Sequence, residues 1–92
     1  MTTPGDAAAR ARTEVRQLAA AKGQPTDNAR RVIERLEHAF VAGELQRTEL
    51  LDQAIQDLQR VLAQADGQRL GGKSGEAARF ILRAIVRRVD EA

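Results

Sequence analysis

Apolar side chains recur at intervals of three and four residues in four segments of the chain, and glycines lie between the segments. This spacing collects apolar side chains on one face of an α-helix, so it predicts helices over residues 3–23, 26–43, 48–66 and 74–90. No segment alternates apolar and polar residues in the manner of a half-buried strand, and we therefore expect no β-sheet.

Short connections between the predicted helices favour an all-α, antiparallel up-down bundle of four helices that forms one domain over residues 1–92. The stripe of the first helix is mostly alanine, so we expect this helix to be held less firmly than the other three. Because the chain has few large core side chains, completion of the core by dimerisation is an open alternative.

The last predicted helix has more apolar surface than one face of a bundle requires. Its apolar arc spans about 240°, whereas a bundle helix needs a little over about 100°. We expect one side of this arc to fill the core through Phe80, Ile81 and Ala84. The surplus side consists of Ala78, Leu82, Val86 and Val89. Two explanations for the surplus are open: cover by the alanine-rich first helix, or contact with another protein.

The charge of the chain is nearly balanced overall but uneven along its length. The formal net charge is +2, and the pI of 9.9 reflects the predominance of arginine over lysine, a bias typical of GC-rich bacterial or phage sources. Residues 48–66 are acidic, and residues 69–88 are basic through Arg69, Lys73, Arg79, Arg83, Arg87 and Arg88. Either these opposite charges pair between neighbouring helices, or the arginines face an external partner.

These patterns favour a non-enzymatic protein–protein interaction module, such as a bacterial regulator, adaptor or antagonist. We expect the last helix to bind another, acidic protein through apolar contacts of Leu82, Val86 and Val89. The arginines that would orient this partner are Arg79, Arg83 and Arg87. A homodimer through the same helix is also open. The alternative function is a small nucleic-acid-binding accessory protein that uses the basic residues of 69–88, although no aromatic residues alternate with them for base stacking.

Residues 67–74 match the phosphate-binding pattern G-x-x-x-x-G-K-[ST] in full. A nucleotide site of this kind requires a buried parallel strand before the glycine-rich loop, whereas the residues before this loop have a helical pattern. We therefore expect an interhelical loop. A weaker interpretation is an anion site at the start of the last helix, formed by Gly71, Gly72, Lys73 and Ser74.

Candidate catalytic and metal-binding residues are scarce. The chain has no cysteine, and its one histidine, His38, lies opposite the apolar stripe of its helix. An exposed histidine on a bundle resembles the histidine phosphotransfer domains, but Val41 and Ala42 replace their lysine and glycine. Residues 33–37 resemble part of the first helix of the all-α chorismate mutases, although Gly43 interrupts that helix here. We expect no enzymatic activity, no cofactor and no metal.

Two features of the sequence predict the cellular location. The N-terminal residues lack the apolar core of a signal peptide, and no apolar run approaches the length that spans a bilayer. We therefore expect a cytoplasmic protein with no membrane contact.

Overall fold

The structure, a computed structural model, describes the backbone of residues 4–66 and 72–91 and the side chains of residues 5–64 and 75–91. These residues form four α-helices and no strand, which confirms the all-α prediction. The helices are α1 (Pro4–Ala20), α2 (Pro25–Val41), α3 (Glu49–Asp66) and α4 (Gly72–Glu91). The helix ends lie within a few residues of the predicted ones.

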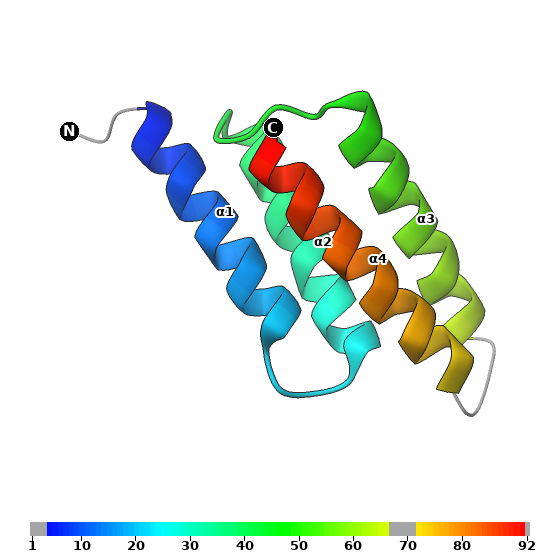
Figure 1. Cartoon of the computed structure of the whole chain (residues 1–92). Coiled ribbons are helices and arrows are strands. Elements are labelled where there is room, and N and C mark those ends of the chain that lie inside the picture. The colour runs from blue at the N-terminus through cyan, green and yellow to red at the C-terminus, as the bar shows by residue number, and fades with distance from the viewer. Residues whose placement is uncertain (1–3, 67–71, 92) are drawn as a thin grey trace.

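Helices α2 and α4 form the centre of the bundle. They run in the same direction and contact each other, and each of them also contacts α1 and α3. Over the described residues, α1 and α3 do not contact each other. In Figure 1, α4 lies in front of α2, with α1 on the left and α3 on the right, and helices adjacent in the chain run antiparallel. Cover by α1 therefore accounts for part of the apolar surplus of α4.

The turn after α2 is a Schellman motif. Gly43 has a φ of +74°, a left-handed conformation that glycine adopts without steric cost. Its N–H donates to the carbonyl of Phe40 at 3.2 Å, and the N–H of Glu44 donates to the carbonyl of Ala39 at 2.8 Å. These bonds satisfy the last carbonyls of α2 and turn the chain towards α3.

The N-termini of α2 and α3 are stabilised in different ways. Helix α3 begins after Thr48, whose Oγ1 accepts a hydrogen bond from the N–H of Leu51 at 3.2 Å, as an N-cap side chain does. Helix α2 begins at Pro25 after Gln24, which makes no side-chain capping bond. Proline suits this position because its fixed φ is helical and its missing N–H would have no partner there.

The core follows the stripes predicted for the first three helices. Their buried apolar side chains are Ala11, Val15, Ala29, Val32, Ile33, Leu36, Ala39, Leu51, Ile55, Leu58 and Leu62. Leu45, from the connection between α2 and α3, joins them. Only the first two belong to α1, so this helix contributes less apolar volume to the core than α2 or α3, in agreement with its shallow stripe.

The core face of α4 differs from the prediction. Phe80, which was expected to fill the core, is 74% exposed and lies about 160° around the helix from Leu82. The core side chains of α4 are Ala78, Leu82, Ile85 and Val89, all at most 3% exposed. The prediction was wrong for Phe80, whereas Ile81 is partly buried and packs against the core as expected. Because α4 is apolar over most of its circumference, helical periodicity alone does not identify the face that contacts α2.

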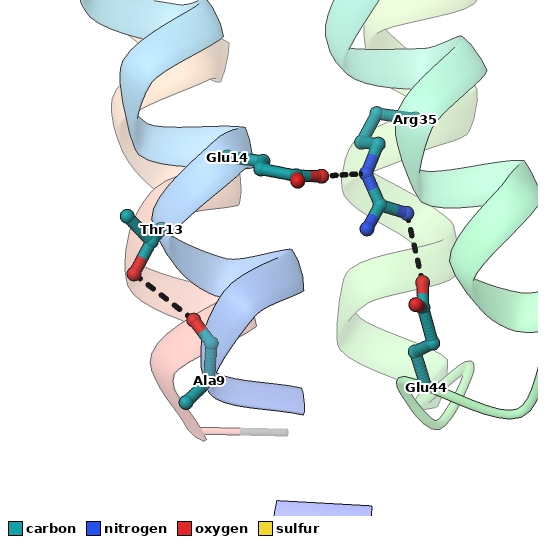
Figure 2. Close-up of polar contacts among 5 residues, drawn as sticks. All are labelled: Ala9, Thr13, Glu14, Arg35 and Glu44. Atoms are coloured by element: carbon teal, nitrogen blue, oxygen red, sulfur yellow. Dashed lines mark hydrogen bonds and ion pairs between the residues drawn. The ribbon is translucent and has the colours of Figure 1, made fainter. Parts of the chain in front are cut away.

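One arginine connects three parts of the chain. Figure 2 shows Arg35 of α2 between Glu14 of α1 and Glu44 of the turn after α2. Its Nε donates to the carboxylate of Glu14, and its Nη1 donates to Oε1 of Glu44 at 2.9 Å. Partial burial acts to lower the pKa of the Arg35 guanidinium, but the two carboxylates outweigh this effect and raise the pKa above its usual value. This pairing holds the middle of α1 against α2.

Candidate functional site

A hollow of about 590 Å³ lies between α1 and α4, beside the connection from α1 to α2. Residues 19–21, all alanine, line it on one side, and α4 lines it on the other. The space remains open because alanine side chains are too short to reach across to α4. Its volume falls within the range of about 300–1,000 Å³ that is usual for binding pockets.

The hollow gathers most of the residues predicted to bind a partner. Its wall on α4 consists of Arg79, Leu82, Arg83 and Val86. The two remaining predicted residues lie elsewhere. Val89 is 1% exposed and belongs to the core, so its assignment to a docking surface was wrong. Arg87 is exposed, but it lies on the outward side of α4 and does not line the hollow.

Leu82 and Val86 contribute to the hollow in different ways. Leu82 is 3% exposed and belongs to the buried core of the chain, so it forms the floor of the hollow and cannot leave it without unpacking the bundle. Val86 is half-buried and does not belong to the set of apolar residues that pack against that core. Val86 is therefore the apolar side chain of α4 that stays partly exposed in the hollow.

The arginines at the rim of the hollow differ in their partners. Arg16 of α1 forms an ion pair with Asp90 near the end of α4. Arg79 and Arg83 are exposed, and neither forms an ion pair within the described part of the chain. Two positive charges beside an apolar space are therefore available to an anionic group.

The acidic residues of α3 do not neutralise these arginines. Asp52 accepts a hydrogen bond from Arg47 at 2.8 Å, and Asp57 lies 3.6 Å from Arg60, its neighbour on the same helix. Among the side chains that the structure describes, no ion pair joins α3 to α4. The charge pairing considered for these neighbouring helices is thus not present there. Arg79, Arg83 and Arg87 are exposed, whereas Arg88 pairs with Glu91 on the same helix.

Phe80 is the functional candidate that the sequence reasoning placed incorrectly. It projects from the outward side of α4, on the same side as Glu76, Arg83 and Arg87. Aromatic side chains and arginine are both enriched at protein–protein interfaces relative to the rest of the surface. The sequence contained a signal for this position, because Glu76 and Arg83 lie one helical turn before and after Phe80.

The remaining candidates from the sequence are the anion site, the phosphate-binding pattern, His38 and a metal site. The anion site predicted at Gly71, Gly72, Lys73 and Ser74 lies outside the residues whose side chains are described. Helix α3 continues to Asp66, so the segment before the phosphate-binding pattern is helical and not a strand. His38 is exposed, as predicted. Within residues 5–64 and 75–91, no group of three or more acidic, histidine or cysteine side chains is placed to hold a metal ion.

Over the part of the chain that the structure describes, no helix is both long enough and apolar enough to cross a bilayer.

Comparison with known proteins identifies no relative. No protein-family model matches the chain, and searches of curated proteins and of solved structures find no significant match. The surfaces that bear on function are the hollow and the outward side of α4.

Proposed function

We propose that this protein is a non-enzymatic interaction module, acting as a regulator or adaptor, that binds an acidic, amphipathic segment of another protein in the hollow between α1 and α4. The observation that supports this proposal most directly is the environment of Val86. Its apolar side chain is half-buried, lies outside the core cluster and lines a hollow whose rim carries two arginines, Arg79 and Arg83, that form no ion pair with any side chain the structure describes.

The shape of the hollow determines what enters it. Leu82 forms an apolar floor, and the alanines of α1 leave room above it, so a single aliphatic side chain of a partner would displace water and bury Val86. The space is open to the surface along α1 and α4, which suits a side chain that projects from a helix or an extended segment.

The rim determines the charge of the partner. Arg79 and Arg83 are one helical turn apart on the same side of α4, so both guanidinium groups reach one acidic segment. Rim charges of this kind raise the association rate and favour acidic partners over basic ones, while the apolar insertion supplies most of the affinity.

Nucleic-acid binding is the second candidate, and one observation favours it. Arg79, Arg83 and Arg87 all lie exposed on α4 without ion pairs in the described residues. Three phosphate contacts from one helix would provide weak, strongly salt-dependent binding. However, Glu76 lies on the same side of α4, Asp90 and Glu91 follow at the end of the helix, and a net charge of +2 gives little long-range attraction to a polyanion.

A titration with defined probes tests both functions. The probe for the proposed function is a synthetic amphipathic helical peptide whose leucine face is flanked by glutamates, with a glutamine version as the matched peptide. We expect the glutamate peptide to shift the amide NMR signals of Val86 and of residues 19–21. Val86→Asp should abolish this binding, and Arg79→Gln or Arg83→Gln should weaken it several-fold.

The control substitution lies on the opposite side of the bundle. Ala63 lines a hollow of about 380 Å³ between α2 and α3, together with Glu34 and Glu37, so Ala63→Asp introduces the same carboxylate away from the proposed site. This variant should bind the peptide like the wild type. Equal effects of Ala63→Asp and Val86→Asp, or micromolar binding of duplex DNA that falls by orders of magnitude as salt rises, would overturn the proposal.

A further inference from the structure

The outward side of α4 contains a second surface that the hollow does not use. Phe80 is 74% exposed, and Ala84, one turn later, is half-buried. Glu76 lies one turn before Phe80, and Arg87 lies about one turn after Ala84. At about 100° per residue, these four side chains fall within an arc of about 80° and form a single stripe along the helix. We call Glu76, Phe80, Ala84 and Arg87 the outward stripe.

The outward stripe has a charge pattern that is complementary to itself. Neither Glu76 nor Arg87 forms an ion pair within the described side chains. The midpoint between Glu76 and Arg87 and the midpoint between Phe80 and Ala84 both lie within half a residue of Leu82 in the chain. A second α4 can therefore be placed antiparallel to the first, with both helices centred on Leu82. In this one arrangement, Glu76 of each copy faces Arg87 of the other, and Phe80 of each copy faces Ala84 of the other.

We infer that the outward stripe is the contact of a two-fold symmetric dimer in which the α4 helices of two copies pack antiparallel. The occupant of the stripe is thus a second copy of this chain. Phe80 of each copy packs over Ala84 of the other, where the small side chain leaves room for the ring. Glu76 of each copy pairs with Arg87 of the other, which gives two equivalent ion pairs, as an isologous contact requires.

The charges exclude the parallel arrangement. A parallel pair of α4 helices would place Glu76 beside Glu76 and Arg87 beside Arg87 of the second copy, and like charges in contact are destabilising. The small net charge of +2 adds little repulsion between two copies at ordinary ionic strength. One helix pair buries less surface than most stable dimers, so we expect dissociation in the micromolar to millimolar range.

Sedimentation velocity from micromolar to millimolar concentrations measures this dimer directly. The full chain should show a reversible, concentration-dependent monomer–dimer equilibrium. Phe80→Ala should raise the dissociation constant by at least about tenfold, because aromatic side chains at the centre of an interface contribute most of its affinity. The matched control is Val41→Ala on α2, since Val41 is 91% exposed and lies outside the outward stripe, and it should leave the equilibrium unchanged.

Charge exchange provides the decisive test of the antiparallel register. Each single variant, Glu76→Arg or Arg87→Glu, places like charges at position 76 of one copy and position 87 of the other. Each variant should therefore be largely monomeric. An equimolar mixture of these two variants should form a heterodimer, because both contacts between position 76 of one copy and position 87 of the other are then of opposite sign. The double variant Glu76→Arg/Arg87→Glu should dimerise again by itself for the same reason.

A further substitution separates this dimer from the binding function of the hollow. The two Arg83 side chains of the dimer lie on the same side of the contact and repel each other, so Arg83→Gln should not weaken dimerisation. The same change should weaken binding of the acidic peptide. A chain that remains monomeric at millimolar concentration, a dimer insensitive to Phe80→Ala, or a mixture that fails to associate would overturn the inference while leaving the peptide result intact.

Discussion

Leu82 and Val86 occupy successive turns of α4, yet only Leu82 belongs to the core. Leu82 is 3% exposed and contacts the buried residues of the bundle, whereas Val86 is half-buried at the hollow beside α1. This difference separates the residue that maintains the fold from the residue that stays accessible at the hollow.

The first prediction compares the same substitution at these two positions. Leu82→Asp places a carboxylate in the core and should unfold the chain at 25 °C, because it both removes apolar burial and buries a charge without a partner. Val86→Asp should change the free energy of unfolding by less than about 1 kcal/mol, since the carboxylate remains in contact with solvent. Urea titration followed by circular dichroism measures both. Unfolding of the Val86 variant would place Val86 in the core.

The second prediction concerns the arginine that connects α1 to α2. The Arg35 side chain is 16% exposed and pairs with two carboxylates, so Arg35→Met should lower the free energy of unfolding by about 1–2 kcal/mol. Arg60 is the matched control, because its side chain is 71% exposed and lies 3.6 Å from Asp57, its only ion-pair partner among the described side chains. Arg60→Met should cost less than about 0.5 kcal/mol. Similar losses at both positions, measured by urea titration, would show that Arg35 does not join the helices.

The pKa of Arg35 also determines how this contribution depends on pH. The pKa of the Arg35 guanidinium is higher in the folded chain than in the unfolded chain. The stability that this difference contributes is therefore fully present at any pH below the pKa in the unfolded chain. It is lost only as the pH rises through the pKa in the folded chain. Both values are far above neutrality because arginine stays charged in proteins. The stability difference between wild type and Arg35→Met should therefore remain constant from neutral to mildly alkaline pH. A difference that changes across this range would require another titrating group.

The sequence predicted the type, number and approximate ends of the helices because periodic stripes and glycine stops are local signals. The stripe predicted for the second helix consists of Ala29, Val32, Ile33, Leu36, Ala39 and Phe40. The first five are buried in the core, and Phe40 is partly buried against it. The orientation of α4 could not be obtained in this way. Its apolar arc is so wide that Phe80 and Leu82, on opposite sides, both satisfy a helical pattern. Only the positions of α1, α2 and α3 around α4 distinguish them.

Only the part of the candidate site that depends on helical spacing could be predicted from the sequence. Arg79, Arg83 and Val86 come together at the hollow because they share one side of α4, and helical spacing reveals this relationship. The hollow itself depends on how closely the alanines of α1 approach α4, which is a tertiary distance. Val89 was assigned to the docking surface because a helical wheel does not distinguish the side that faces α1 from the side that faces the core.

The third prediction contrasts two glycines with different backbone conformations. Gly43 has a φ of +74°, so Gly43→Ala forces a side chain into the left-handed region and should lower the free energy of unfolding by about 1 kcal/mol. Gly75 lies within α4, and a Cβ added there meets Pro25 Cγ at an ordinary contact distance of 3.9 Å. Gly75→Ala should stabilise the chain by about 0.5 kcal/mol because alanine favours the helix. Thermal unfolding should therefore shift in opposite directions for the two variants.

The fourth prediction compares the two phenylalanines of the chain. Phe40 is half-buried, packs against the core, and has the guanidinium of Arg47 over its ring at 4.6 Å from the centroid. Phe40→Ala should therefore lower the free energy of unfolding by about 2 kcal/mol, since it removes both apolar packing and the cation–π contact. Phe80 is 74% exposed, and Phe80→Ala should change the stability of the monomer by less than about 0.5 kcal/mol.

Chemical denaturation at low protein concentration measures this comparison without interference from self-association. The same experiment at high concentration should then show a loss of stability for Phe80→Ala, because dimer formation adds to the stability of the wild type only where the dimer is populated. Phe40→Ala should show the same loss at both concentrations. If Phe80→Ala destabilises the dilute monomer as much as Phe40→Ala does, Phe80 packs within the chain and is not available to a second copy.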